Sequence, residues 1–449
     1  MTAQLWFAPG DAYMLAFDFQ RFQAPLGKLG LKFSTTPAQW PMTLAPQKDG
    51  KWRVTQSDDF DFSVTTPSDK IDAKSEGVSF EGLFDPALPG FVSAVSVVKK
   101  TTADDTKFSV NALSPVSSTV TNDMRSESHA VASGAGVQSV TFHQTVHDKT
   151  QHIVVDVPAK AGENNDKKPA PFALDVNFGE STTDGKIDGL RARAILDLWT
   201  FLLAHSGDPA KDAPDELKTR LRAALPLFDR LGVDASMKKI AATTPLGQLA
   251  AGELDVKMGL NGLRSDGAFD QKLAAKEIAL PAAMLPAWAN GLAPTDIAWD
   301  IKATGFDPAG AVEVLIASLG SGGPGKPEID AELLRKLLPN GDADVKLTDM
   351  RLASKLYELK IDALIKPSLE RKTTLTATIV GKGLDVALKA LAAAGKSDKD
   401  ALQAWLSLQI ATALAKPGPN GTLVWEIALP ADGNLTVNGA PLGKMGQKP

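Results

Sequence analysis

The stretch that decides the predicted fold is Gly305-Phe306-Asp307-Pro308-Ala309-Gly310-Ala311-Val312-Glu313-Val314-Leu315-Ile316-Ala317-Ser318-Leu319. It joins the end of an alternating, strand-like segment to an apolar helix, with Asp307 as N-cap and Pro308 at the first helical position. Similar motifs precede apolar helices at Lys186-Ile187-Asp188 and Gly383-Leu384-Asp385. In each case a Gly/Ser-containing turn, a second helix and strand-like sequence follow. We therefore predict three related strand and helix-pair units, at about residues 172–250, 251–340 and 341–442.

The N-terminal part of the chain reads differently. Apolar and polar residues alternate in residues 13–19, 52–64 and 108–112, and Asp, Gly and Pro separate these runs. We predict a β-rich domain over residues 1–160, a polar linker at 159–171 and the repeated region over 172–449. The predicted fold class is α+β, with long and mostly antiparallel β-sheets covered by pairs of helices.

Composition excludes several classes of function. The 449-residue chain has no cysteine, which excludes thiol catalysis, disulfides and cysteine metal sites. A net charge of -5 without a basic cluster, and only two tyrosines, argue against a nucleic-acid partner. No apolar run reaches the roughly 20 residues of a transmembrane helix. No cofactor is indicated.

Four of the five histidines lie close together in the sequence: His129, His143, His147 and His152. The last three fall in a segment that we predict to be a hairpin, residues 137–157, with its loop at 148–151. That hairpin places His147 opposite His152 and His143 opposite Asp156. A catalytic zinc needs three protein ligands, and these pairs are incomplete. We predict a solvated face and no metal site, although the role of the three histidines stays open.

Motifs for catalysis are absent or incomplete. There is no Gly-x-Ser-x-Gly elbow. Neighbouring carboxylates such as Asp58 and Asp59 point to opposite faces of a strand. Residues 320–326 have the glycine and lysine spacing of a phosphate loop, but Pro327 stands where a hydroxyl is needed, so a linker is favoured. We predict that the protein is not an enzyme.

The apolar helices are the candidate binding surface. Residues 194–204 are apolar nearly all round, and residues 282–292 add a second apolar segment. Such helices either pack in a core or face an apolar ligand, and the sequence leaves both alternatives open. On the second alternative, the predicted lining residues are Leu198, Trp199, Phe201, Leu202, Leu285 and Trp288.

The C-terminal Leu-Pro-Ala-Asp-Gly-Asn-Leu-Thr-Val-Asn-Gly-Ala-Pro-Leu, residues 429–442, predicts a hairpin with an Asp-Gly turn. This segment resembles the C-terminal signature of uncharacterised exported bacterial envelope proteins, namely an alphaproteobacterial domain-of-unknown-function family and the YdgA-like group. The resemblance implies a periplasmic location and brings no catalytic residues. Residues 1–5 lack the features of a signal sequence, so export implies that one has been removed.

Together these observations predict a non-enzymatic periplasmic protein that binds or carries an apolar, lipid-like ligand in a sheet-and-helix groove. The alternative is an envelope scaffold or protein-interaction module with a fully packed core. In that alternative, function lies on strand edges or loops, and the partner is another envelope protein.

Overall fold

The structure is a computed structural model that describes residues 2–18, 31–107, 114–156, 172–205, 209–319, 327–369 and 371–444. The chain divides into two compact units. Unit 1 is Met1–Leu231 with Ala235–Pro245, and unit 2 is Gly232–Asp234 with Leu246–Pro449. Three predicted segments lie outside the described residues: the strand at 108–112, the linker at 159–171 and the loop at 320–326.

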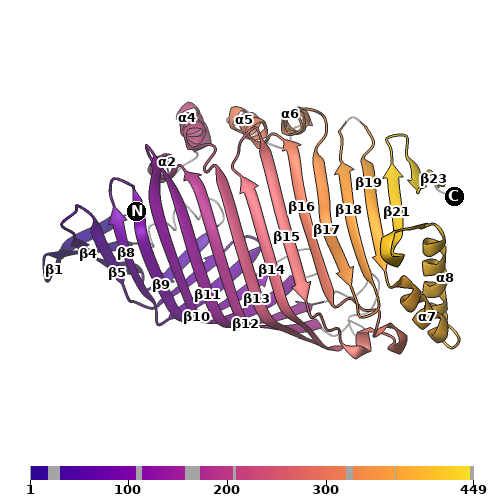
Figure 1. The fold of residues 1–449 in the computed structure, drawn as a ribbon. Coiled ribbons are helices and arrows are strands. Elements are labelled where there is room, and N and C mark those ends of the chain that lie inside the picture. The colour runs from indigo at the N-terminus through magenta and orange to yellow at the C-terminus, as the bar shows by residue number, and fades with distance from the viewer. Residues whose placement is uncertain are drawn as a thin grey trace, which may run out of the picture. The chain divides into compact units, whose positions relative to one another are not determined.

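The predicted α+β class, with helix pairs covering the sheets, is wrong. Strands account for 57% of the structure and helices for only 21%. The strand pairs within each unit are antiparallel. The physical reason is that the strands extend far beyond the short alternating runs of the sequence, up to 21 residues in Ser114–Gly134. Most of the helices occupy connections beyond the strand ends (Figure 1).

Unit 1 is built on four long strands, of which one divides the sheet. Strand β9 pairs with β10 over residues 93–106, whereas its other edge pairs with β8 over residues 90–97 and with β7 over residues 100–107. Two sheet branches therefore leave β9. One runs β8-β5-β4-β2-β1 and the other β7-β6-β3. The strands are β1 (Thr2–Ala8), β2 (Ala12–Asp18), β3 (Lys32–Thr36), β4 (Gln39–Pro46), β5 (Trp52–Gln56), β6 (Phe60–Thr65), β7 (Asp69–Glu76), β8 (Ser79–Asp85), β9 (Gly90–Lys107), β10 (Ser114–Gly134), β11 (Val137–Asp156), β12 (Phe172–Leu190) and β13 (Arg230–Thr244).

The predicted hairpin at 137–157 is wrong, because residues 137–156 form one continuous strand, β11. The polar residues read as a loop are accommodated at a β-bulge, where Asp148 takes a positive φ of 54°. His147 therefore lies opposite Glu180 of β12 and not opposite His152, and His143 lies opposite Asp184 and not opposite Asp156.

Between β12 and β13 the chain forms three helices: α2 (Ala192–Ala204), α3 (Pro209–Asp212) and α4 (Pro214–Ala224). Helix α2 begins at Ala192 rather than at Asp188 as predicted. Asp188 still belongs to β12, where its carboxylate accepts a hydrogen bond from Ser139 Oγ at 3.0 Å. Gly189, with φ 69°, then turns the chain out of the strand.

Unit 2 is an antiparallel sheet in the order β14-β15-β16-β17-β18-β19-β21. Its remaining elements lie in the connections and at the C-terminal edge. The elements are β14 (Gly247–Asn261), β15 (Gly267–Lys276), η3 (Ala282–Met284), η4 (Ala287–Ala289), β16 (Asp296–Phe306), α5 (Pro308–Ser318), α6 (Pro327–Leu337), β17 (Asp344–Ala353), β18 (Glu358–Lys366), β19 (Thr374–Lys382), α7 (Leu384–Ala394), α8 (Lys399–Ala413), β20 (Lys416–Pro417), η5 (Pro419–Gly421), β21 (Leu423–Leu429), β22 (Asn434–Val437) and β23 (Ala440–Lys444).

The unit 2 sheet has one apolar face and one charged face. Directly opposed residues form an unbroken apolar row across all seven strands: Leu260, Phe269, Ala303, Val345, Ile365, Leu375 and Leu429. On the other face, cross-strand ion pairs join Lys276 to Glu253 and Lys272 to Asp300, both at 2.6 Å. These hydrogen bonds raise the pKa of both lysine ammonium groups. We call the first surface the apolar face of unit 2.

Helices α7 and α8 pack against only the C-terminal end of this apolar face. Leu384 of α7 and Trp425 of β21 belong to one buried cluster, which Leu408 of α8 and Ile379 of β19 adjoin. Trp425 Nε1 donates a hydrogen bond to the carbonyl oxygen of Ala411 at 2.7 Å. This helix pair is therefore anchored by a satisfied indole as well as by apolar packing.

The strand-to-helix turn before α7 makes a stability prediction. Gly383 has φ 74°, and a Cβ there would lie 2.3 Å from the carbonyl oxygen of Leu356. Gly421 has a similar φ of 73° with nothing within 4 Å. We expect Gly421→Ala to lower the free energy of unfolding by about 1–2 kcal/mol, because an alanine is strained in the left-handed backbone conformation. Gly383→Ala should lower it clearly more, because its Cβ would also meet the carbonyl oxygen of Leu356. Chemical denaturation measures both, and equal costs would contradict the close approach.

Candidate functional site

The N-terminal strands of unit 1 have two chemically distinct faces. Successive side chains of a strand point to opposite faces. In β5 this separates Trp52 and Val54 from Arg53 and Thr55. In β4 the same alternation separates Trp40, Met42 and Leu44 from Pro41 and Thr43. Register aligns the apolar sets, because Leu44 lies opposite Val54 in β5 and opposite Tyr13 in β2.

The apolar side chains of these strands line an open cavity of about 920 Å³. A volume of this size is in the usual range for small-molecule sites, about 300–1,000 Å³. Phe60 of the second sheet branch also lines it, and its ring lies 4.4 Å from that of Trp40 of the first branch. The lining residues are Leu5, Tyr13, Leu15, Trp40, Met42, Leu44, Trp52, Val54, Gln56, Phe60, Val78, Phe80, Phe84, Phe91 and Ser96.

Contacts between aromatic rings hold the wall of this cavity. The ring centroids of Tyr13 and Trp52 are 5.8 Å apart, and the ring of Phe91 lies edge-on to those of Phe80 and Phe84 at 5.2 and 5.6 Å. Edge-to-face contacts of this kind fix ring orientation as well as burying area. Gly82 makes room for them, since a Cβ there would lie 2.6 Å from Phe91 Cδ1.

The cavity carries almost no polar chemistry. Its described lining contains no Lys, Arg, Asp, Glu or His. Gln56 is one of its few polar residues, and its amide already donates a hydrogen bond to the carbonyl oxygen of Asp58 at 2.8 Å. The site therefore provides burial for apolar groups, and its described lining carries no charged side chain.

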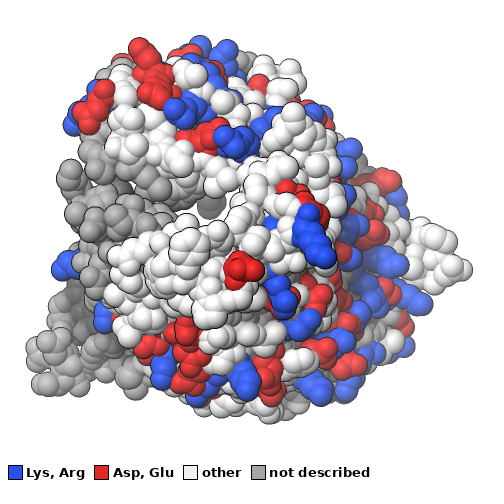
Figure 2. Space-filling view, turned by 90° about the vertical axis from the view of Figure 1, so that its left-hand side faces the viewer, with Lys and Arg blue, Asp and Glu red and all other residues white. Residues whose placement is uncertain are grey.

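The cavity is open to solvent at one end. Val54 and Val78 are buried, whereas Leu5 of β1 is 61% exposed although it lines the same cavity. Figure 2 faces the side that carries the N-terminal strands. There, residues other than Lys, Arg, Asp and Glu gather around a hollow, with most of the charged residues outside it.

The opposite face of these strands bounds a second cavity, of about 1110 Å³, with a mixed lining. Its two arginines are already paired. Arg53 contacts Glu81 at 2.9 Å, and Arg125 contacts Glu127 at 2.6 Å. Such exposed ion pairs contribute little to stability. Because both guanidinium groups have carboxylate partners, this face offers no ready anion site.

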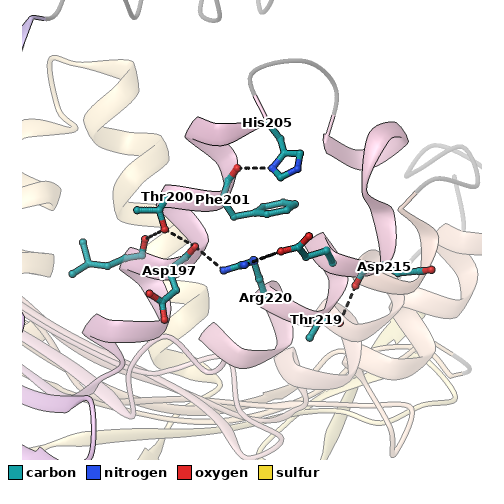
Figure 3. Close-up of polar contacts among 9 residues, drawn as sticks. Asp197, Thr200, Phe201, His205, Asp215, Thr219 and Arg220 are labelled. Carbon is teal, nitrogen blue, oxygen red and sulfur yellow. Dashed lines mark hydrogen bonds and ion pairs between the residues drawn. The ribbon is translucent and has the colours of Figure 1, made fainter. Parts of the chain in front are cut away.

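Among the predicted lining residues of α2, Phe201 points towards α4 (Figure 3). Phe201 is buried between the His205 ring, at 4.2 Å, and the Arg220 guanidinium of α4, at 5.0 Å. Arg220 is itself fixed by Glu216 at 2.7 Å and by the carbonyl oxygen of Asp197 at 3.2 Å. Phe201 thus closes the contact between α2 and α4.

The other predicted lining residues are dispersed. Trp199 is 58% exposed, while Leu198 and Leu202 are half-buried. Leu285 and Trp288 belong to unit 2, where both are half-buried next to η3 and η4. None of the six residues lines the apolar cavity of unit 1, so their role in binding stays a prediction.

The histidines of β11 face carboxylates on the neighbouring strand β12. His143 Nδ1 lies 2.7 Å from Asp184 Oδ1, and His152 Nδ1 lies 2.5 Å from Asp175 Oδ1. Both are exposed cross-strand pairs. Among the described residues no group of three or more His, Asp or Glu side chains is arranged to hold a metal.

Comparison with protein-family models, with characterised proteins and with solved structures gives no match. The resemblance of residues 429–442 to exported envelope proteins therefore stays a prediction. In the part of the chain that the structure describes, no helix is both long and apolar enough to cross a membrane.

The role of Gly82 can be tested directly. We expect Gly82→Ala to displace the Phe91 ring and to lower the free energy of unfolding by about 1–3 kcal/mol, as overpacking does. Gly134→Ala is the control, because the nearest atom to its Cβ would be 3.6 Å away. Urea denaturation compares the two. If both alanines cost the same, the close packing of Phe91 over Gly82 would be contradicted.

Proposed function

We propose that unit 1 binds an apolar ligand, a molecule with a long acyl chain, in the apolar cavity that the β8-β5-β4-β2-β1 branch lines together with Phe60. The observation that carries this proposal is the large aromatic and aliphatic lining that stays half-exposed around about 920 Å³. A cavity of that kind is ordinarily a binding site, because apolar surface left in water is unfavourable.

The chemistry of the lining favours an alkyl chain over a polar ligand. A polar ligand group loses its hydrogen bonds to water on burial, and the lining offers few replacements. Each methylene of an alkyl chain gains about 0.8 kcal/mol on burial. Since about 1.4 kcal/mol is a factor of ten, affinity rises roughly fourfold with each added methylene until the cavity is filled.

The open end gives such a ligand its orientation. Leu5 lies at the exposed part of the lining, so a charged or polar head group stays in water there while the chain enters the cavity. This supports a binding or carrying role rather than catalysis. The resemblance at the C-terminus supports placing that role in the bacterial periplasm, as part of the same proposal.

A matched pair of variants in β4 tests the proposal. Met42 and Thr43 are adjacent and both half-buried, but only Met42 lines the apolar cavity. We expect Met42→Gln to weaken binding of a fluorescent long-chain fatty acid by about five- to a hundredfold. The reason is that an amide buried without partners costs about 1–3 kcal/mol. Thr43→Gln should leave the affinity within about twofold of the wild type.

Direct titration followed by displacement with unlabelled fatty acids of increasing length supplies the measurement. Far-UV circular dichroism confirms that both variants are folded. The proposal is overturned if the wild-type protein does not bind, or if the two variants lose affinity equally. A packed scaffold that acts through a protein partner would give the first of these results.

A further inference from the structure

The apolar face of unit 2 is covered over only part of its width. At the β19–β21 end, helices α7 and α8 bury Trp425 to 8% exposure. Towards the other end, Met258 is 44% exposed, Leu260 39% and Ile365 36%. Large side chains on β14 and β18 thus face solvent, whereas Trp425 on the same face of β21 is buried.

We propose that this uncovered part, on β14 to β18, is a second acyl-chain binding site that uses none of the residues of the N-terminal cavity. Its ligand class is the same as that of the proposed function, but the inference rests on different strands in a different compact unit. Either proposal can therefore be wrong while the other is right.

The two faces of the unit 2 sheet differ in charge. The opposite face of the same strands carries ion pairs such as Lys366 with Asp344 at 3.1 Å and Arg351 with Glu358 at 2.7 Å. Charges of that density keep that face hydrated. The charged side of the sheet is therefore suited to water, whereas the exposed apolar side chains of the other side are stabilised by an apolar covering.

The scarcity of polar groups identifies the covering as alkyl rather than protein. Protein interfaces carry about one hydrogen bond per 100–200 Å². On this part of the face the side-chain polar groups are those of Gln271 and Trp299, and Trp299 Nε1 is buried without an acceptor among the described residues. An alkyl chain needs no hydrogen bond, so it matches a surface that offers almost none.

The uncovered part of the apolar face is large enough for an acyl chain. From Leu254 to Leu260 the face runs about 20 Å along β14, at roughly 3.3 Å per residue. The hydrocarbon core of a bilayer is about 30 Å thick, so an acyl chain, which spans half of it, is about 15 Å long and fits within this length. Five strands at about 4.8 Å spacing give a width of about 19 Å. The area is then about 400 Å², at which exposed apolar patches are commonly functional.

Photo-crosslinking with a diazirine-bearing palmitic acid tests the inference on the full chain. Peptide mapping by mass spectrometry locates the label. We expect label on β14–β18 as well as on β4–β8. The double variant Met258→Gln with Ile365→Gln should lower labelling of β14–β18 at least fivefold and leave β4–β8 labelled. Leu364→Gln with Thr376→Gln, on the charged face, is the control and should change neither.

The outcomes separate the two sites. Label on β4–β8 alone overturns this inference and leaves the proposed function standing. Label on β14–β18 alone supports this inference and overturns the proposed function, and no label overturns both. A dimer in native mass spectrometry that prevents labelling of β14–β18 would show that a second copy covers the face, and would also overturn the inference.

Discussion

The period of two along a β-strand is the constraint on which this structure depends. Because neighbouring side chains point to opposite faces, long alternating strands place their apolar groups on one face and their polar groups on the other. Antiparallel register then aligns these groups into rows, such as the one from Leu260 to Leu429 in unit 2. A sheet built in this way needs its apolar face covered, and most of the helices lie elsewhere (Figure 1).

The consequence is a protein with little conventional core. No large side chain among the described residues is less than 2% exposed, and many of the buried apolar residues are alanines. Stability comes from extended backbone pairing, from ring contacts such as Trp40 with Phe60, and from one helix-covered cluster around Trp425. The apolar surface that remains half-open is available for a ligand. Structure and proposed function thus have a common cause, since the surface that helices leave uncovered is the surface on which we propose binding.

Local features of the fold were readable from the sequence. Asp307 caps α5, and Pro308 is its first residue, as predicted from the motif. The alternation in residues 13–19 and 52–64 predicted strands, and β2, β5 and β6 lie there. The hairpin at β11 was predicted wrongly because a bulge at Asp148 looks like a turn in sequence. Alternation gives the face of each strand, but it does not give the partner of that strand.

That limit explains why the cavity was not predicted. Its lining depends on non-local pairs, β5 with β8 and β3 with β6, and on the division of the sheet at β9. No local pattern encodes which distant strands meet. The apolar helices attracted the prediction because they are uniformly apolar over a short stretch. In α2, however, Phe201 serves the packing of one helix on another.

The most direct measurement is native mass spectrometry of the protein as isolated, followed by organic extraction of whatever accompanies it. The account predicts a stoichiometric adduct that extracts as an acyl-chain lipid, because apolar surface left in water is unfavourable. A bare polypeptide mass that stays unchanged after incubation with envelope lipids would contradict it.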